Sequence, residues 1–197
     1  SGSRFCAANG NEESAMSVSE ETYRRVSLED PEGLWELVCG RLRSKPLMTT
    51  EHYDVAGILV HLLNAQLGLS DSSVRMEGPR LRISTRTYYL PDVCVVPRAY
   101  IRRLRETPGS FETYTDPMPL VVEVWSPSTG NYDVKDKLRE YQGRGDLEIW
   151  RLHPYERTLT TWRRQTDGSY SEALLRVGTV RPVALPSVSI ELAALFG

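Results

Sequence analysis

The sequence predicts a mixed α/β fold, and three observations support this prediction. Apolar residues recur at helical spacing over one long segment, residues 50–67. Elsewhere they alternate with polar residues or form short runs rich in Val, Ile and Leu, which is typical of strands. Hydrophobic residues make up 40% and charged residues 25% of the 197-residue chain, so we expect one globular domain over residues 17–197.

Helical spacing and capping residues predict where the helices lie. The clearest helix covers residues 50–67, where either Thr49 or Thr50 is suited to cap the first turn. Gly68 follows its end, as a residue that readily stops a helix. The other helices are predicted at residues 17–30, 100–105, 132–142 and 190–196.

Short apolar and alternating runs predict the strands. The most strand-like of them is residues 119–125, Pro-Leu-Val-Val-Glu-Val-Trp. A hairpin over residues 34–42 is expected to turn at Gly40. Gly78-Pro79 is expected to form a turn between two of the later strands. These are predicted at residues 73–78, 80–85 and 91–96, and a C-terminal β-meander is predicted at residues 147–152, 157–164 and 169–175.

The bulk charge and hydropathy exclude two classes of protein. Lys plus Arg number 24 and Asp plus Glu 26, a formal net charge of −2, so the chain is not a nucleic-acid binder with a wholly basic surface. No apolar run approaches the roughly 18 to 20 residues that span a bilayer, so we expect no membrane partner. Residues 1–16 are a polar head without the apolar segment of a signal peptide, and we expect them to be either disordered or a remnant of cloning.

The cysteines and histidines indicate the compartment. Cys6, Cys39 and Cys94 are odd in number and widely spaced, which favours buried free thiols in a reducing compartment over a disulfide framework or a zinc site. The three histidines show no metal-ligand spacing to one another. The predicted location is the cytoplasm.

Charge is distributed unevenly along the chain. Residues 11–36 carry a local charge of −6, whereas residues 75–105 carry +6. Because arginine binds phosphate bidentately, the second segment is a candidate DNA-binding surface. Its candidate contact residues are Arg80, Arg82, Arg86, Arg102 and Arg103. The alternative is a solvated strand face, and composition alone leaves both open.

Two acidic residues interrupt apolar strands. Asp92 directly precedes the run Val93–Val96, and Glu123 lies inside the run Leu120–Trp125. A charge buried alone costs several kcal/mol, so each carboxylate must be paired, metal-bound or protonated. Neighbouring strands could bring the two together, where they would suit a hard cation such as Mg²⁺. The alternative for each is an arginine partner or backbone N–H donors at a strand end.

A lysine on the next helix is the candidate cation beside these acids. Because side chains alternate along a strand, Trp125 projects from the same face of the strand as Glu123, at the position where a lysine could have stood. Asp133, Lys137 and Tyr141 are spaced to share one helix face. Lys137 either reaches a phosphate over the strand end or forms an exposed ion pair with Asp133, worth ~0.3–0.5 kcal/mol.

Together these motifs resemble the Uma-type restriction endonuclease family, which belongs to the PD-(D/E)XK nuclease superfamily. The resemblance rests first on Pro91-Asp92, on the string Val-Glu-Val-Trp-Ser-Pro-Ser-Thr at residues 122–129, and on Lys137 and Tyr141. Further matches are the segment from Glu36 to Gly40, Pro46 and His52 before the long helix, and Glu148-Ile-Trp150. It extends from about residue 18 to the end of the chain.

The resemblance implies a restriction-endonuclease-like core, a mixed β-sheet flanked by helices. It implies that Asp92 and Glu123 bind Mg²⁺ or Mn²⁺ and that, with Lys137, they catalyse phosphodiester hydrolysis in DNA. The further site residues that it implies are Glu36, Tyr141, Ser126 and His52. A homodimer is expected by analogy with nucleases that cut both strands.

Two other hypotheses stay open at this point. Trp125 stands where the superfamily usually has its motif lysine, so the chain could be an inactive DNA-binding or scaffold protein with the nuclease fold. A carboxylate-pair hydrolase of a non-nucleic substrate is the third hypothesis. The arginine cluster argues against it for any neutral substrate.

Overall fold

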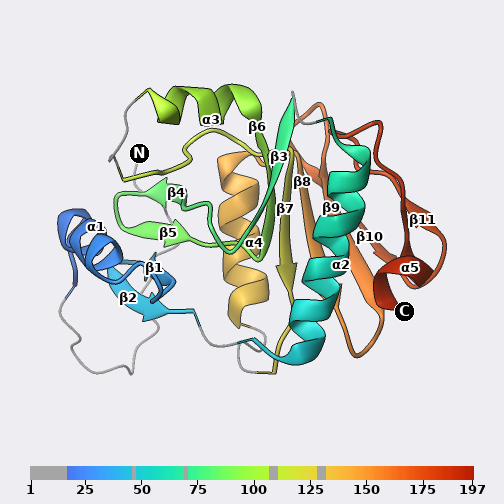
Figure 1. Cartoon of the computed structure of the whole chain (residues 1–197), viewed down its shortest axis with the longest axis horizontal. Helices are drawn as coiled ribbons and strands as arrows, with labels where there is room; N and C mark the ends of the chain where they lie inside the picture. Colours follow the sequence, from blue (N-terminus) through green and yellow to red (C-terminus); the bar gives the residue numbers. More distant parts are fainter. Residues whose placement is uncertain (1–16, 46–47, 69–70, 107–110, 128–131) are drawn as a thin grey trace.

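A six-stranded sheet forms the centre of the protein in the computed structural model, which describes residues 17–45, 48–68, 71–106, 111–127 and 132–197 (Figure 1). Only β7 and β8 are parallel, and all other neighbours in the sheet are antiparallel. In spatial order the strands are β10 (Tyr170–Leu175), β9 (Thr158–Arg164), β8 (Glu148–His153), β7 (Leu120–Val124), β6 (Val93–Pro97) and β3 (Ser72–Met76). The C-terminal meander is therefore confirmed as β8–β9–β10.

A second sheet lies beside the first, and the sequence did not predict this division. Its order is β2 (Arg41–Ser44), β1 (Trp35–Val38), β5 (Thr87–Tyr89) and β4 (Leu81–Ser84). The expected hairpin forms, because Cys39 and Gly40 take φ of 52° and 83°, the left-handed values that a two-residue hairpin turn requires.

The segment 72–97 is divided between the two sheets. β3 pairs with β6 and β4 pairs with β5, so Gly78-Pro79 joins strands of different sheets and does not form the expected turn between paired strands. β5 was missed altogether. The alternation of apolar and polar residues indicates that a segment is extended, but it does not indicate with which strand that segment pairs.

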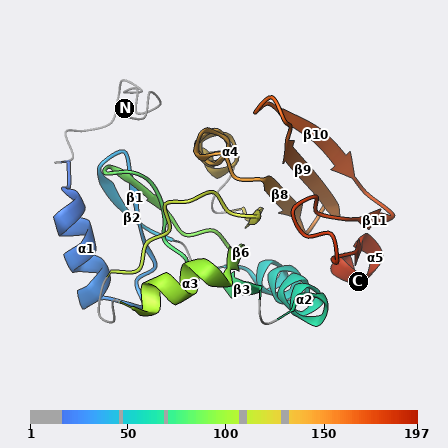
Figure 2. The same ribbon diagram turned by 90° about the horizontal axis from the view of Figure 1, so that it is seen from above.

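Helices cover both faces of the main sheet, as predicted for a mixed α/β fold (Figure 2). Thr49 caps the long helix by accepting a hydrogen bond from the backbone N–H of His52. One face carries α2 (Thr50–Gln66) and α5 (Leu192–Phe196), the other carries α4 (Tyr132–Arg144), and α3 (Arg98–Arg105) and α1 (Glu20–Glu29) lie toward the second sheet.

The last predicted helix, residues 190–196, is wrong in its first turn. Ile190–Glu191 is strand β12, paired with β11 (Thr179–Val180), and α5 begins only at Leu192. The alternation of Ile190 with its neighbours fits either structure, and pairing with β11 decides between them.

Two apolar clusters fix the sheet between its helices. On the α2 side Leu59 and Leu63 pack against Val122 and Trp150, and on the α4 side Val121 packs with Tyr141. All six side chains are fully buried. Burying one such side chain stabilises the fold by about 1.5–3 kcal/mol. The alternating faces of β7 therefore hold that strand in a fixed register between two helices.

The cysteines correct one prediction. Cys94 is a buried free thiol, as expected. Cys39 is disulfide-bonded, contrary to the prediction of free thiols throughout. Spacing along the chain does not limit which cysteines the fold brings together. The expectation about residues 1–16 lies outside the described part of the chain. No described helix is long and apolar enough to cross a membrane.

Candidate active site

Asp92 and Glu123 come from neighbouring antiparallel segments. The register of β6 with β7 ends at the pair Val93–Val122, and Asp92 directly precedes this pair on one strand while Glu123 directly follows it on the other. Both side chains border the same cavity. Asp92 is also tied to β7, because the backbone N–H of Val124 donates to its Oδ2 at 2.6 Å. The structure thus brings the two predicted carboxylates together.

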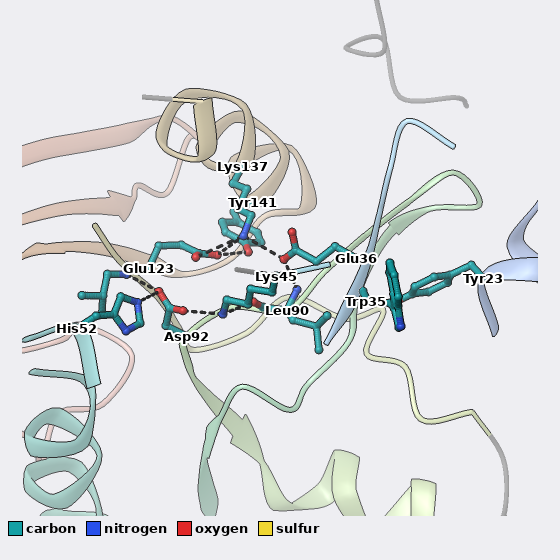
Figure 3. Close-up of polar contacts among 11 residues, drawn as sticks. Tyr23, Trp35, Glu36, Lys45, His52, Leu90, Asp92, Glu123, Lys137 and Tyr141 are labelled. Atoms are coloured by element: carbon teal, nitrogen blue, oxygen red, sulfur yellow. Dashed lines mark hydrogen bonds and ion pairs between the residues drawn. The ribbon is translucent and has the colours of Figure 1, made fainter. Parts of the chain in front are cut away.

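Asp92 is held in its charged form. Its side chain is 2% exposed, and Lys45 Nζ lies 2.5 Å from Oδ1 while His52 Nε2 lies 3.0 Å from Oδ2 (Figure 3). Burial alone would raise the pKa of Asp92, but the Lys45 and His52 contacts outweigh it and leave the pKa well below its ordinary value. Lys45 is fixed in turn by donating to Leu90 O at 2.9 Å.

Glu123 has the opposite character. Tyr141 donates its hydroxyl to Oε1 at 2.6 Å, and Lys137 Nζ lies 3.4 Å from the same oxygen. Burial raises the pKa of Glu123 to about 7, and the neighbouring Asp92 charge adds to the effect while Lys137 opposes it. Near neutral pH this carboxyl therefore exchanges between its protonated and charged forms.

Lys137 links the main sheet to the second sheet. Its Nζ lies 3.0 Å from Oε1 of Glu36, which comes from β1, and 5.3 Å from the ring centre of Tyr89 in β5. Glu36 is itself positioned by the backbone N–H of Leu90, which donates to Oε1 at 2.8 Å. The lysine is 4% exposed. The interpretation of Lys137 as an exposed surface cation is therefore wrong, since its partners are buried carboxylates.

Several of these side chains border one cavity beneath α4. Its wall includes both carboxylates and the cationic side chains Lys45, Lys137 and Arg151. Trp125 and Trp162 contribute aromatic surface to the same wall. Acidic and basic groups of one buried site thus face a space that a small part of a substrate can enter.

The donor set fits a divalent metal ion. Among the described residues no three His, Cys, Asp or Glu side chains are grouped to hold a metal. However, Mg²⁺ is commonly bound by one or two carboxylates, with water and substrate phosphates completing its shell. Asp92 and Glu123 supply two such carboxylates at one cavity, and Lys45 contacts Oδ1 of Asp92. The residues therefore fit, with Lys45 as a competing cation.

Comparison with known proteins agrees with this architecture. A family model described as Uma2, putative restriction endonuclease, matches residues 20–194. The chain belongs to this family. A crystal structure of a putative nuclease belonging to DUF820 from Anabaena variabilis ATCC 29413 has the same fold, with a TM-score of 0.73 and 16% sequence identity over 91% of this chain and 97% of that one. No curated protein matches the chain.

The other site residues predicted for this Uma2 chain fall into two groups. Glu36, Tyr141 and His52 contact the central acids or Lys137, as described above. Ser126 is buried two residues after the end of β7. Its part in the site stays a prediction.

The five predicted DNA-binding arginines are not among the residues that line the cavity. Arg82 pairs with Glu20 and Arg103 pairs with Asp116. The remaining three differ in their surroundings: Arg86 donates to Cys39 O, Arg80 lies over the ring of Phe111, and Arg102 is exposed. Several of these arginines thus have structural partners of their own, and their DNA contacts stay a prediction.

Sequence reasoning missed Lys45 and Arg151 of this Uma2 site. Lys45 lies in a connection between two elements. Arg151 is the single arginine of its strand, and nothing in the sequence distinguishes it from the many other arginines of the chain. A signal for Lys45 did exist. The chain has only three lysines among its 24 basic residues, and two of them, Lys45 and Lys137, are buried at the acids.

Proposed function

We propose that this protein is a divalent-metal-dependent endonuclease that hydrolyses phosphodiester bonds in DNA. The observation that carries the proposal is that Asp92, just before β6, and Glu123, in the neighbouring strand β7, border one cavity whose wall also includes two lysines. Membership of the Uma2 family supports nuclease activity. Mg²⁺ or Mn²⁺ is the proposed metal, with these two carboxylates as its protein ligands.

The contacts of the individual residues support the roles that we propose for them. Bound at this site, a divalent ion polarises a phosphate and lowers the pKa of its water ligand. Tyr141 orients Glu123 through the 2.6 Å hydrogen bond, and Val124 N–H and His52 hold Asp92. We assign to Lys137 the stabilisation of negative charge on the phosphate; its Nζ, 3.4 Å from Glu123 at the cavity wall, supports this role. Glu36 keeps that lysine in position.

One observation favours a second candidate function, a DNA-binding or scaffold protein without catalysis. Lys45 Nζ lies 2.5 Å from Oδ1 of Asp92, so the site neutralises one of its own acids. Trp125, at the position where the superfamily usually has its motif lysine, also favours this second candidate. This candidate differs in one measurable property, because it binds DNA without cutting it when Mg²⁺ or Mn²⁺ is added.

A cleavage assay tests the proposal. Supercoiled, linear and branched DNA are incubated with the protein in Mg²⁺, in Mn²⁺ and in EDTA. We expect cleavage with metal only, and its loss in Asp92→Asn. Asp167→Asn is the matched control, because Asp167 is an exposed carboxylate in the turn between β9 and β10. Cleavage in EDTA, or equal cleavage by both variants, contradicts the proposal.

Three further predictions accompany this function. The cytoplasmic location, the homodimer and the single domain over residues 17–197 all stay predictions. The homodimer can be checked by light scattering of the purified protein with and without DNA, where a mass near 22.3 kDa would contradict it.

A further inference from the structure

The cavity contains one cationic side chain whose charge no described acid balances. Lys45 pairs with Asp92, and Lys137 pairs with Glu36 and Glu123. Arg151 lines the same cavity, and within the described part of the chain it forms no ion pair. Its Nε is buried and has no hydrogen-bond partner among the described residues. Buried donors are usually satisfied, so this one is a candidate for binding something that the free protein does not supply.

The sheet places Arg151 next to the acids. In the parallel pairing of β7 with β8, Arg151 is the register partner of Glu123. Residues in register on neighbouring strands project from the same face, so the guanidinium and the carboxylate both lie on the α4 side. The Cζ atom of the guanidinium lies 6.0 Å from the centre of the Trp162 ring. That distance is at the outer limit of a cation–π contact, so the ring does not satisfy the guanidinium donors.

We propose that Arg151 binds a phosphate group of the nucleic-acid strand in this cavity and so positions the strand beside Asp92 and Glu123. A guanidinium presents donors in a planar fork that matches two phosphate oxygens. The cavity's lysines already contact carboxylates, whereas the buried Nε of Arg151 has no hydrogen-bond partner among the described residues. The inference rests on the proposed nuclease function. It adds a phosphate-binding residue on β8 to those predicted from the sequence in segment 75–105.

A binding experiment without metal tests this assignment separately from catalysis. Fluorescence anisotropy of a labelled oligonucleotide, single- or double-stranded, is measured in EDTA for the wild type, Arg151→Gln and Arg176→Gln. Arg176 is exposed at the end of β10 and does not line the cavity, so its variant removes the same charge elsewhere. We expect about 10-fold weaker binding for Arg151→Gln, as for the loss of charge-assisted hydrogen bonds, and less than about 2-fold for Arg176→Gln.

A second variant separates phosphate recognition from folding. Arg151→Lys keeps the charge but loses the fork, so its affinity should fall between those of the wild type and Arg151→Gln. Thermal melts of all variants check that they are folded. The salt dependence of Arg151→Gln should also be shallower than that of the wild type, by about one phosphate contact.

The outcomes distinguish the two proposals. Equal affinity of wild type and folded Arg151→Gln overturns the Arg151 assignment, whether or not the wild type cleaves DNA. The same holds if the wild type does not bind the oligonucleotide. Weaker binding by Arg151→Gln, together with no cleavage by the wild type in any metal, supports phosphate binding by Arg151 and overturns the nuclease function.

Discussion

The cavity and the arginine-rich segment 75–105 are both rich in cationic side chains, but they use them differently. In the cavity Lys45 and Lys137 are 5% and 4% exposed and contact carboxylates that are buried with them. In the other region Arg103 and its partner Asp116 are 63% and 54% exposed. Water and salt screen the second pair and hardly affect the first. The difference indicates that burial, and not the number of charges nearby, determines which ion pairs of this protein are strong.

The same comparison changes the meaning of the net charge of −2. From the sequence, the basic segment was either a DNA-binding surface or a solvated strand face, and the acidic segment was considered separately from it. In the structure they partly neutralise each other, because Glu20 of α1 pairs with Arg82 of β4. The cationic surface that is left without an acidic partner is therefore smaller than the sequence indicates.

The largest effect on stability should come from Lys45→Met measured in EDTA. Removing this lysine leaves the Asp92 charge buried without its nearest counter-ion, which costs about 3–5 kcal/mol of unfolding free energy. Urea unfolding measures it. Adding Mg²⁺ should stabilise this variant more than the wild type, since the competing cation is gone. Lys135→Met, an exposed lysine of α4, is the control. A Lys45→Met loss as small as that of the control would mean that Asp92 is not a buried charge.

The next largest effect should be on catalysis, from Lys137→Met. If the proposed function holds, DNA cleavage with Mg²⁺ should fall roughly 10²–10³-fold, as when a preorganised charge-stabilising group is removed. The control is again Lys135→Met, which changes an exposed lysine two positions earlier on the same helix. Steady-state kinetics should place the loss mainly in kcat. Equal activity of the two variants would remove Lys137 from the mechanism.

The sequence predicts the carboxylates of the cavity better than its cations. Asp92 and Glu123 interrupt runs of Val and Leu, and such an interruption is visible in a linear sequence because an unpaired buried charge is costly. Lys45 interrupts nothing, since it lies in a connection between two elements. Its importance arises from the fold, which brings the end of β2 against the start of β6 through the contacts of Lys45 with Leu90 and Asp92.

The division into two sheets was unpredictable for the same kind of reason. Strand patterns identify β3, β4 and β6, but pairing depends on contacts far apart in sequence. The pairing of Leu37 with Tyr88 joins β1 to β5 and carries Glu36 to the site. Local sequence therefore predicts most elements and the two acids, whereas the third acid's position depends on long-range pairing.

A smaller effect should appear in the pH dependence of stability without metal. The pKa of Glu123 is raised to about 7 in the folded protein, so the unfolded chain releases this proton at lower pH than the folded protein. The resulting stabilisation is complete below pH ~4.5 and is lost as pH rises through about 7. Asp92 does not interfere, because its pKa is lowered and it stays charged over this range.

Urea unfolding of wild type and Glu123→Gln at pH 5 and pH 8 in EDTA measures the contribution of Glu123 to the free energy of unfolding. Relative to the variant, the wild type should lose on the order of 1–3 kcal/mol between the two pH values. A parallel pH dependence in both proteins would show that Glu123 keeps an ordinary pKa, and that the cavity is better solvated than its burial indicates.

The smallest effect is expected for the exposed pair of Arg103 and Asp116, although its Nη2–Oδ2 distance is only 2.8 Å. A double-mutant cycle with Arg103→Gln and Asp116→Asn should give a coupling below about 1 kcal/mol, decreasing further as salt is added. Short distance alone does not make an ion pair strong, because two solvated side chains exchange water for each other at little net gain. A coupling comparable to the loss in Lys45→Met would break the contrast between the two regions, since it would mean that exposure does not weaken the pair.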